Sequence, residues 1–441
     1  MVPAKAAAAV GSRPKALVGA PARIAILQID FALIPTAAFA LYWFSSLVIV
    51  AMNRQHLFGS DAVLYVQLAD AHTFERIGTY YSIDRITRFH PTTTAMAWAW
   101  MKILHPLTAW MSPEQLLRTM FAAVGAVGVW AAMTVFADFV PRRQVPLWGT
   151  IYAVSLGIWF FSSIEESKIV TATLAALYIV VYLGLRKRWT TRGALALTAI
   201  LLVAGLNEIV ATFLIAIPAV DTLVRHGWEL RHGRWIAAHG LAPAIAFALL
   251  EGVVRPYTGG ATSEGPAGEA VSHLSMLIFY LTQNDFSWTS LYGFLANWLL
   301  FSIAAPTVQT TFAALPEWPQ FQGFFERSLA NYFSSPVSGA LVVVFGVMLA
   351  ASLAVLTRRE KMDLPFAGVL LGLLTYALLR GGFYYSVNTR ECFLYASGTT
   401  LPHLLMIGTL FAASNFPAKQ SLLYSCALLL FITNGTFVIG Q

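Results

Sequence analysis

Long apolar runs constrain the fold of this chain more than any other feature. Eleven of them have spanning or near-spanning length, at 31–52, 116–139, 145–161, 168–185, 193–206, 208–224, 236–253, 337–357, 364–381, 393–413 and 419–438. The runs are continuously apolar rather than alternating, which indicates helices and not the strands of a membrane barrel. With 58% hydrophobic and 11% charged residues, the 441-residue chain is too apolar for a water-soluble globule. The sequence therefore predicts an all-α polytopic membrane protein.

The number of spans depends on three less regular stretches. Residues 270–284 and 290–306 are weaker runs that raise the prediction from about eleven spans to thirteen if both cross. Residues 92–111 have the hydropathy of a span but contain Lys102 and a His-Pro step. If they crossed, the arginine clusters after residues 141, 185 and 224 would become external, against the positive-inside rule. We therefore place 92–111 flat on the external surface.

The charge distribution then predicts an orientation. More than half of the 28 lysines and arginines fall on the cytosolic side, and most of the 21 acidic residues fall outside. The net charge of +7 is thus a topology signal in short clusters between apolar runs, and not a nucleic-acid-binding face. We expect a multi-pass inner-membrane protein with a cytosolic N-terminus and an external, periplasmic C-terminus. Cys392 and Cys426 have neither disulfide nor metal-site spacing.

We expect four regions along the chain. They are a disordered cytosolic tail at 1–23, a transmembrane module at 24–255 with an external loop at 53–115, an external or interfacial region at 256–336, and C-terminal transmembrane helices at 337–441.

The first external loop is predicted to contain two interfacial helices. The first, about 61–77, places Leu64, Leu68 and Phe74 on one apolar stripe. The second begins at His90-Pro91, because proline suits a first helical turn. Ser112 to Gln115 has the pattern of a capping box that opens the next span.

Ionisable residues gather at the predicted outer ends of several spans, a costly placement unless they line a wet site. The turn at Asn207-Glu208 joins runs too short to cross unless that turn sinks into the membrane, which implies a cavity open to the outside. The candidate site residues are Asp61, Arg88, His90, Glu165, Glu166, Lys168, Asn207, Glu208, Arg255, Arg380, Tyr384, Tyr385, Arg390 and His403.

This combination of groups suits group transfer from a lipid phosphate. A carboxylate can take the proton from an incoming hydroxyl, and cations can stabilise the charge of the departing phosphate. Each residue also has a structural alternative. Asp61 could simply favour the dipole at a helix start, Glu165 and Glu166 could form a solvated turn, and Arg380 and Arg390 could reach to the interface.

The order of these features resembles the GT-C superfamily of glycosyltransferases over roughly residues 24–255. The likeness consists of an acid just after the first span, two interfacial helices, His90-Pro91, an acidic turn after the third span and a short fifth and sixth pair. The superfamily includes the protein O-mannosyltransferases and the aminoarabinose lipid transferases, and the resemblance implies a polyprenyl-phosphate sugar as donor. It puts Asp61 at the catalytic carboxylate position and Glu165 with Glu166 in the acidic second external loop.

The chain also departs from that family. Asp61 stands alone where mannosyltransferases have an Asp-Glu pair, and no Trp-Trp-Asp signature or soluble C-terminal domain is present. A peptide acceptor is therefore disfavoured, and no metal ligand set is indicated, although some family members bind a divalent metal at the acidic loop.

We therefore expect an inverting glycosyltransferase acting on the external face, with a lipid- or polysaccharide-type acceptor and with membrane lipids as its surroundings. Two alternatives remain open at this stage: a ligase or polymerase of lipid-linked oligosaccharides, and a non-enzymatic transporter or flippase of lipid-linked glycans.

Overall fold

The computed structural model of this chain describes twelve stretches, and all structural statements below concern them. They are residues 20–51, 90–108, 110–227, 230–254, 281–282, 287–305, 313–315, 318–323, 332–333, 335–357, 366–387 and 392–440. These stretches are helical apart from a short antiparallel ladder of β1 (Ala313–Leu315) and β2 (Trp318–Gly323).

The helices of the first half are α1 (Ala20–Ala51), α4 (Pro91–Leu104), η2 (His105–Leu107), α5 (Pro113–Phe139), η3 (Arg142–Gln144), α6 (Val145–Val154), α7 (Leu156–Ser162), α8 (Lys168–Lys187), α9 (Thr191–Asn207), η4 (Ile209–Ile215) and α10 (Ala216–His226). Those of the second half are α11 (Leu230–His239), α12 (Leu241–Leu249), η5 (Leu250–Val254), α15 (Trp288–Leu295), η6 (Ala296–Phe301), α16 (Pro336–Leu356), α17 (Ala367–Val387), α18 (Cys392–Ala413) and α19 (Lys419–Gly440).

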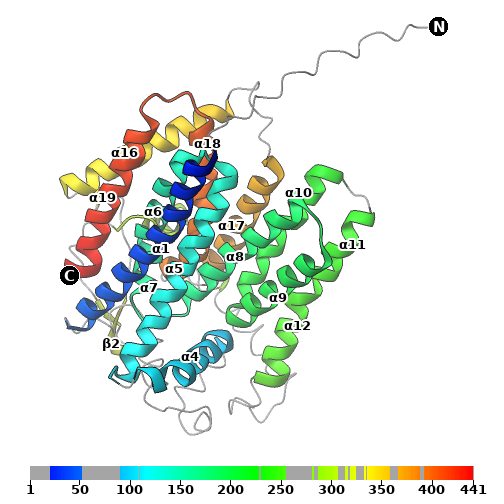
Figure 1. The fold of residues 1–441 in the computed structure, drawn as a ribbon, viewed down its shortest axis with the longest axis horizontal. Helices are drawn as coiled ribbons and strands as arrows, with labels where there is room; N and C mark the ends of the chain where they lie inside the picture. The colour runs from blue at the N-terminus through cyan, green and yellow to red at the C-terminus, as the bar shows by residue number, and fades with distance from the viewer. Residues whose placement is uncertain are drawn as a thin grey trace.

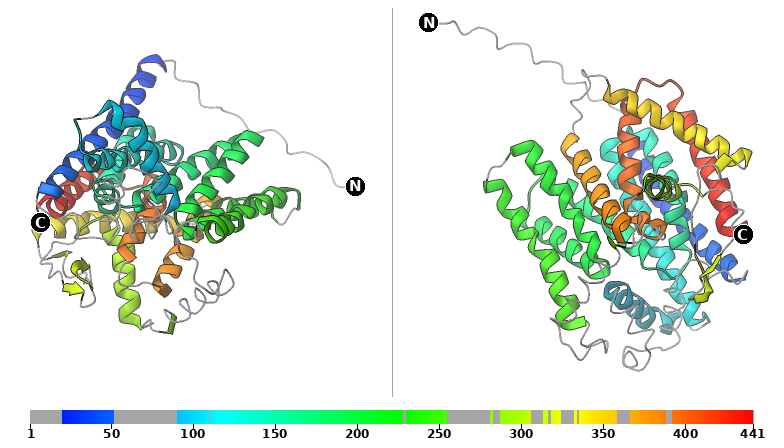
Figure 2. Two further views of the ribbon diagram at one scale, coloured as in Figure 1. Left: turned by 90° about the horizontal axis from the view of Figure 1, so that it is seen from below. Right: turned by 180° about the vertical axis from the view of Figure 1, so that it is seen from behind.

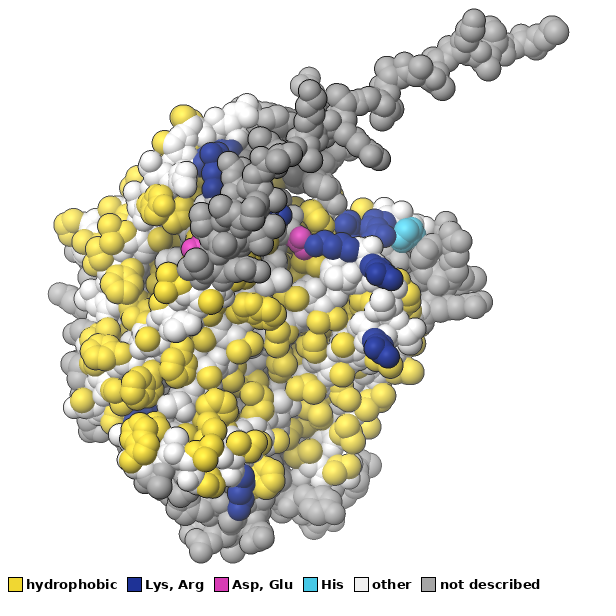
Figure 3. Space-filling view, in the orientation of Figure 1, with side chains coloured by type: hydrophobic (Ala, Val, Ile, Leu, Met, Phe, Trp, Pro, Cys, Tyr) yellow, Lys and Arg dark blue, Asp and Glu magenta, His cyan; other side chains and the backbone are white. Residues whose placement is uncertain are grey.

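Within the described stretches, eight helical segments are long and apolar enough to cross a membrane, and a bent pair would make nine. The chain is thus a multi-pass helical protein in its general form, while eleven spans remain a prediction. Figure 3 shows hydrophobic side chains over the middle of one face, with most visible Lys and Arg side chains in the upper half of the view. Such an apolar middle with basic residues toward one end is typical of a membrane-spanning bundle.

The centre of the bundle is formed by α5 and α8, with α1 and α6 packed around α5 (Figure 1). Small residues allow this close approach. A Cβ atom at Gly125 would come within 2.1 Å of Ser162 Oγ, and one at Gly128 within 2.7 Å of Thr173 Oγ1. These two α5 positions therefore require glycine so that the central helices can touch.

The predicted span at 145–161 is not one straight helix. It divides at Ser155 into α6 and α7, which meet at an angle of 60°. The backbone N–H groups of Leu156 and Gly157 donate to the carbonyls of Ile303 (3.0 Å) and Ser302 (2.9 Å), so another segment replaces the missing intrahelical partners. The break coincides with Ser155 and Gly157, and Gly/Ser pairs are among the positions at which helices kink.

Asn434 on α19 completes this junction. Its side chain accepts from Ala305 N (2.7 Å) and donates to the carbonyls of Val154 (2.7 Å) and Ile303 (2.8 Å). The N–H groups of Leu156 and Gly157 and the carbonyl of Val154 thus find partners inside the protein, as lipid-embedded backbone requires.

The segment 287–305 enters the bundle from the side. Figure 2 shows α15 and η6 projecting from the body in the view from below and seen end-on from behind. Trp288 at the outer end is 85% exposed, whereas Phe301, Ile303, Ala304 and Ala305 belong to the main core. Part of the region predicted to be external or interfacial at 256–336 therefore lies inside the bundle.

The boundary of α17 differs from the sequence prediction. The run predicted at 364–381 is a helix from Ala367 to Val387, so the helix continues past the predicted end and includes Tyr384 as well as Arg380. The Gly381-Gly382 pair lies inside this helix, and the missing side chain of Gly381 leaves room for Trp298, whose Nε1 would lie 3.3 Å from an added Cβ.

Two local predictions in the first loop are confirmed. A helix begins at Pro91, and Ser112 with Gln115 forms the capping box at the start of α5. Figures 1 and 2 show α4 lying across one end of the bundle, which we name the α4 end. The predicted interfacial helix 61–77 lies outside the described residues, and the location of α4 at a membrane surface stays a prediction.

The orientation can be tested by labelling. In a variant with Cys392→Ser and Cys426→Ala, the substitution Trp110→Cys is expected to react with an impermeant maleimide from outside, and Trp189→Cys only in inverted vesicles. Trp110 is 78% exposed and Trp189 is 52% exposed. They lie at opposite ends of the bundle. Trp110 precedes the start of α5, whereas Trp189 follows Lys187, which pairs with Asp138 near the end of α5. The reverse labelling pattern would contradict an external α4 end.

Candidate functional site

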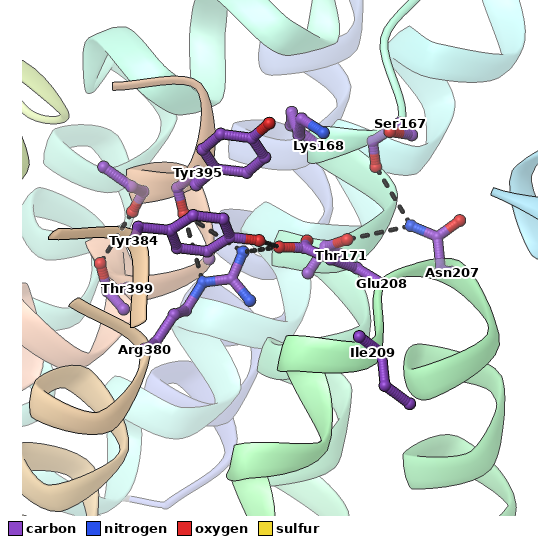
Figure 4. A network of polar contacts seen from close by, with 12 residues as sticks. Ser167, Lys168, Thr171, Asn207, Glu208, Ile209, Arg380, Tyr384, Tyr395 and Thr399 are labelled. Carbon is purple, nitrogen blue, oxygen red and sulfur yellow. Dashed lines mark hydrogen bonds and ion pairs between the residues drawn. The ribbon is translucent and has the colours of Figure 1, made fainter. Parts of the chain in front are cut away.

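A buried ion pair joins two segments that are far apart in the sequence. Arg380 Nη2 on α17 lies 2.6 Å from Glu208 Oε1, which follows α9. The hydroxyl of Tyr384, one turn along α17, donates to the same carboxylate oxygen. Figure 4 shows the three side chains meeting between the helices.

The guanidinium of Arg380 is fixed in place by its neighbours. Its Nε and Nη2 both donate to the carbonyl of Tyr395 at 3.2 Å. The missing side chain of Gly398 provides the space, since an added Cβ would lie 3.1 Å from Arg380 Cζ. Arg380 is only 1% exposed and Glu208 8% exposed, so the pair lies in a low-dielectric environment.

The pair is not saturated. Among the described residues, Arg380 Nη1 and Glu208 Oε2 are both buried and make no hydrogen bond. Buried polar atoms normally find a partner, so an exception needs a physical explanation such as a ligand. Here a spare donor and a spare acceptor belong to one ion pair, so together they could accommodate a molecule with both an anionic and a hydroxyl group.

Lys168 adds a second buried cation. Its Nζ lies 3.9 Å from Glu166 Oε1 and 4.6 Å from the ring centroid of Tyr395. The Tyr395 ring in turn stacks on Tyr384, with centroids 3.9 Å apart. We name the set of Lys168, Glu208, Arg380, Tyr384 and Tyr395 the polar cluster.

Electrostatics keep Glu208 ionised. Burial by itself raises the pKa of its carboxyl, but the charges of Arg380 and Lys168 outweigh burial and lower the pKa to about 2. Glu208 therefore acts as a hydrogen-bond acceptor and not as an acid at neutral pH.

Asn207, directly before Glu208, points the opposite way and is fully buried (Figure 4). Its Oδ1 accepts from Thr93 Oγ1 (2.6 Å) and Thr93 N (3.2 Å), and its carbonyl accepts from His90 Nδ1 (2.7 Å). Its Nδ2 donates to Thr171 Oγ1 (2.9 Å) and the Ser167 carbonyl (3.4 Å). The side-chain amide thus uses both donors and both acceptor positions, and it joins α4 to α8.

A second buried ion pair lies in the turn between α7 and α8. Arg118 Nε on α5 donates to Glu165 Oε1 at 2.5 Å, and Arg118 also pairs with Glu114. Burial raises the pKa of Glu165 despite the opposing charge of Arg118, so its carboxyl binds a proton more readily than that of Glu208.

Aromatic side chains extend from the polar cluster along η6 and α15. Trp298 lies 6.0 Å from Tyr384 between ring centroids, and Phe294 stacks on Trp298 at 5.5 Å and contacts Tyr385 at 5.1 Å. A row of buried aromatic side chains therefore leads from the charges along η6 and α15, and the start of α15 carries the exposed Trp288.

The structure brings together many of the residues predicted from the sequence. His90, Glu166, Lys168, Asn207, Glu208, Arg380 and Tyr384 form one connected set of contacts, with Tyr385 at its aromatic edge and Glu165 in the adjacent turn. Their side chains are buried, so the described residues show a closed cluster and not the open cavity expected from the sequence.

Other predicted residues are not part of this set. His403 is buried on α18, about two turns after Tyr395. Its Nδ1 has no hydrogen-bond partner among the described residues. Asp61, Arg88, Arg255 and Arg390 lie outside the described residues.

Several contacting residues were missed by sequence reasoning. Arg118 could have been recognised as a basic residue inside an apolar span, four residues after Glu114. Thr93, Thr171 and Tyr395 carry no local signal, because their roles depend on partners far away in the sequence.

No group of three or more His, Cys, Asp or Glu side chains in the described stretches could hold a metal ion. A divalent metal bound with the help of the external loop stays a hypothesis. Comparison with protein-family models finds no match to this chain, and comparison with curated proteins finds no match either.

The ion pair makes a prediction for stability. Arg380→Met is expected to lower the free energy of unfolding by about 3–5 kcal/mol, because it leaves the Glu208 carboxylate buried without its cation. The double variant Glu208→Gln/Arg380→Met removes both charges and is expected to recover at least half of that loss. Chemical unfolding of the purified protein in detergent measures both values.

The exposed pair Lys187 and Asp138 is the matched control. Its atoms are 2.6 Å apart, but Lys187 is 58% exposed, so Lys187→Met should change stability by about 0–1 kcal/mol. Equal effects of Lys187→Met and Arg380→Met would contradict the importance of burial.

Proposed function

We propose that this protein is a membrane-embedded glycosyltransferase that moves a sugar from a polyprenyl-phosphate carrier to a lipid- or polysaccharide-type acceptor on the external face. The observation that carries the proposal is the unsaturated ion pair. A buried guanidinium with a spare N–H group beside a buried lysine is suited to bind a phosphate in a lipid environment.

The cations of the cluster would act mainly on the leaving group. As the bond between the sugar C1 and the phosphate oxygen breaks, its electron pair passes to the phosphate. Arg380 and Lys168 are fixed before the reaction, and such preorganised charges stabilise developing negative charge strongly in a water-poor site. Glu208 keeps Arg380 oriented and offers its free oxygen to a sugar hydroxyl.

Asp61 is the proposed general base. It would take the proton of the acceptor hydroxyl while the acceptor oxygen forms a bond to C1 from the face opposite the phosphate, which inverts the anomeric configuration. The resemblance to GT-C transferases supports this role, and the residue belongs to the loop that leads into α4. Proton transfer of this kind contributes about 10²–10⁴ in rate.

The apolar row from Tyr384 through Trp298 and Phe294 gives the direction in which the isoprenoid chain of such a donor would extend, along η6 and α15. It begins at the charges and runs along η6 and α15 to the exposed Trp288. A polyprenyl phosphate has the same arrangement of one anionic head on an extended apolar chain.

A lipid-linked glycan transporter is the second candidate, because the α6–α7 span is broken as transporter helices often are. The break, however, is filled by backbone and by Asn434, whose contacts satisfy the freed groups. Its polar groups are thus committed to structure, whereas the charges gather at Glu208. We therefore favour the transferase.

The test of this function uses purified protein in lipid nanodiscs with labelled polyprenyl-phosphate sugars, and it measures release of polyprenyl phosphate and labelled product. Asp61→Asn is expected to lower turnover at least about 100-fold while the unfolding temperature stays near that of the wild type.

Asp138→Asn is the matched control, since it makes the same change at the opposite end of the bundle and should leave turnover unchanged. Unchanged turnover in Asp61→Asn would remove that residue from the mechanism. Uptake of lipid-linked sugar across the bilayer without chemical turnover would instead support the transporter.

A further inference from the structure

Resting on the proposed function, we infer that Asn207 is a positioning residue that couples the start of α4 to the polar cluster. It does so through the Asn207 network, which consists of His90, Thr93, Ser167, Thr171 and Asn207 itself. The network is separate from the ion pair, and no part of it needs to touch substrate.

The network holds the chain at the start of α4. His90 directly precedes α4, and Thr93 lies in its first turn. The backbone carbonyl of Asn207 accepts from His90 Nδ1 at 2.7 Å, and its side-chain Oδ1 accepts from Thr93 Oγ1 at 2.6 Å. Thr92 adds a bond from its hydroxyl to the Val203 carbonyl at 3.0 Å, also on α9. The start of α4 is therefore fixed to the last turn of α9.

Asn207 and Glu208 are adjacent in the chain. The side chain of Asn207 points toward α4 and α8, and that of Glu208 points toward α17 (Figure 4). Because neighbouring Cα atoms are about 3.8 Å apart, a shift of Asn207 moves Glu208 with it. The position of the start of α4 relative to Arg380 is thus set through two consecutive residues.

Asn207 also contacts α8. Asn207 Nδ2 donates to Thr171 Oγ1, one turn after Lys168, and to the carbonyl of Ser167, directly before it. The same amide therefore also fixes the start of the helix that supplies the second cation. Loss of the amide would displace Glu208 and Lys168 together, and displacements of about 1 Å cost about 100-fold in rate.

The experiment compares Asn207→Ala with wild type by three readouts. We expect kcat per folded molecule to fall about 100-fold, the donor KM to change less than threefold, and amide hydrogen exchange of α4 to accelerate about tenfold or more. Thr93→Val should lower kcat about tenfold, because it removes the hydroxyl donor to Asn207, whereas Thr93→Ser keeps the hydroxyl and should restore kcat.

Asn434→Ala is the control, because Asn434 is another fully buried amide with three hydrogen bonds, at the α6–α7 break. It should reduce stability and leave both kcat per folded molecule and exchange of α4 unchanged. A kcat of Asn207→Ala within threefold of wild type, or an equal loss in Asn434→Ala, would overturn the inference.

Hydrogen exchange separates this inference from the proposed function. Rapid exchange of α4 in Asn207→Ala without any transferase activity in the wild type would refute the function and leave only a structural role for Asn207. Unchanged exchange of α4 in an active enzyme would refute the coupling alone.

Discussion

The organisation of the α4 end depends on the cost of burying charge. Arg380 and Glu208 come from segments 172 residues apart, and neither could remain in an apolar bundle alone, because an uncompensated buried charge costs several kcal/mol. The pair fixes α17 against the α9–η4 break, and Gly398 and the carbonyl of Tyr395 shape the space around the guanidinium. The bond to Tyr384 and the nearby charge of Lys168 follow from the same need to satisfy Glu208.

Hydrogen-bond saturation differs between the buried amides of Asn207 and Asn434 and the Arg380–Glu208 ion pair. The amides of Asn207 and Asn434 make hydrogen bonds with both their oxygen and their nitrogen atoms, which is the expected behaviour of groups that hold a fold together. The ion pair keeps one donor and one acceptor unused among the described residues. Saturated amides beside an unsaturated ion pair suggest that the surrounding helices are held rigid so that the free atoms keep their places for a ligand.

Sequence reasoning reached the helical membrane class and much of the polar cluster for a simple reason. Charged residues in an apolar chain are rare, and those at Glu208, Lys168 and Arg380 stand out against their runs. The shortness of the runs on either side of Asn207 also predicted a sunken turn, and the turn is buried. The start of α4 and the capping box were readable from local chemistry.

Other features depended on contacts that no local pattern records. The α6–α7 break is stabilised by Asn434, 280 residues from Val154, and the buried end of η6 comes from a run that is only weakly apolar. The run that contains Arg380 was predicted to end at residue 381, whereas α17 continues to Val387. Asp61 lies outside the described residues, so its role still rests on resemblance.

The central claim is that the ion pair holds the phosphate of a polyprenyl carrier, and binding without turnover tests it most directly. Native mass spectrometry would titrate polyprenyl phosphate into the wild type and into Glu208→Gln/Arg380→Met, in which the charges are removed together. We predict one bound lipid per wild-type molecule and at least tenfold weaker binding by the folded double variant. Equal affinity of the two proteins would contradict this account.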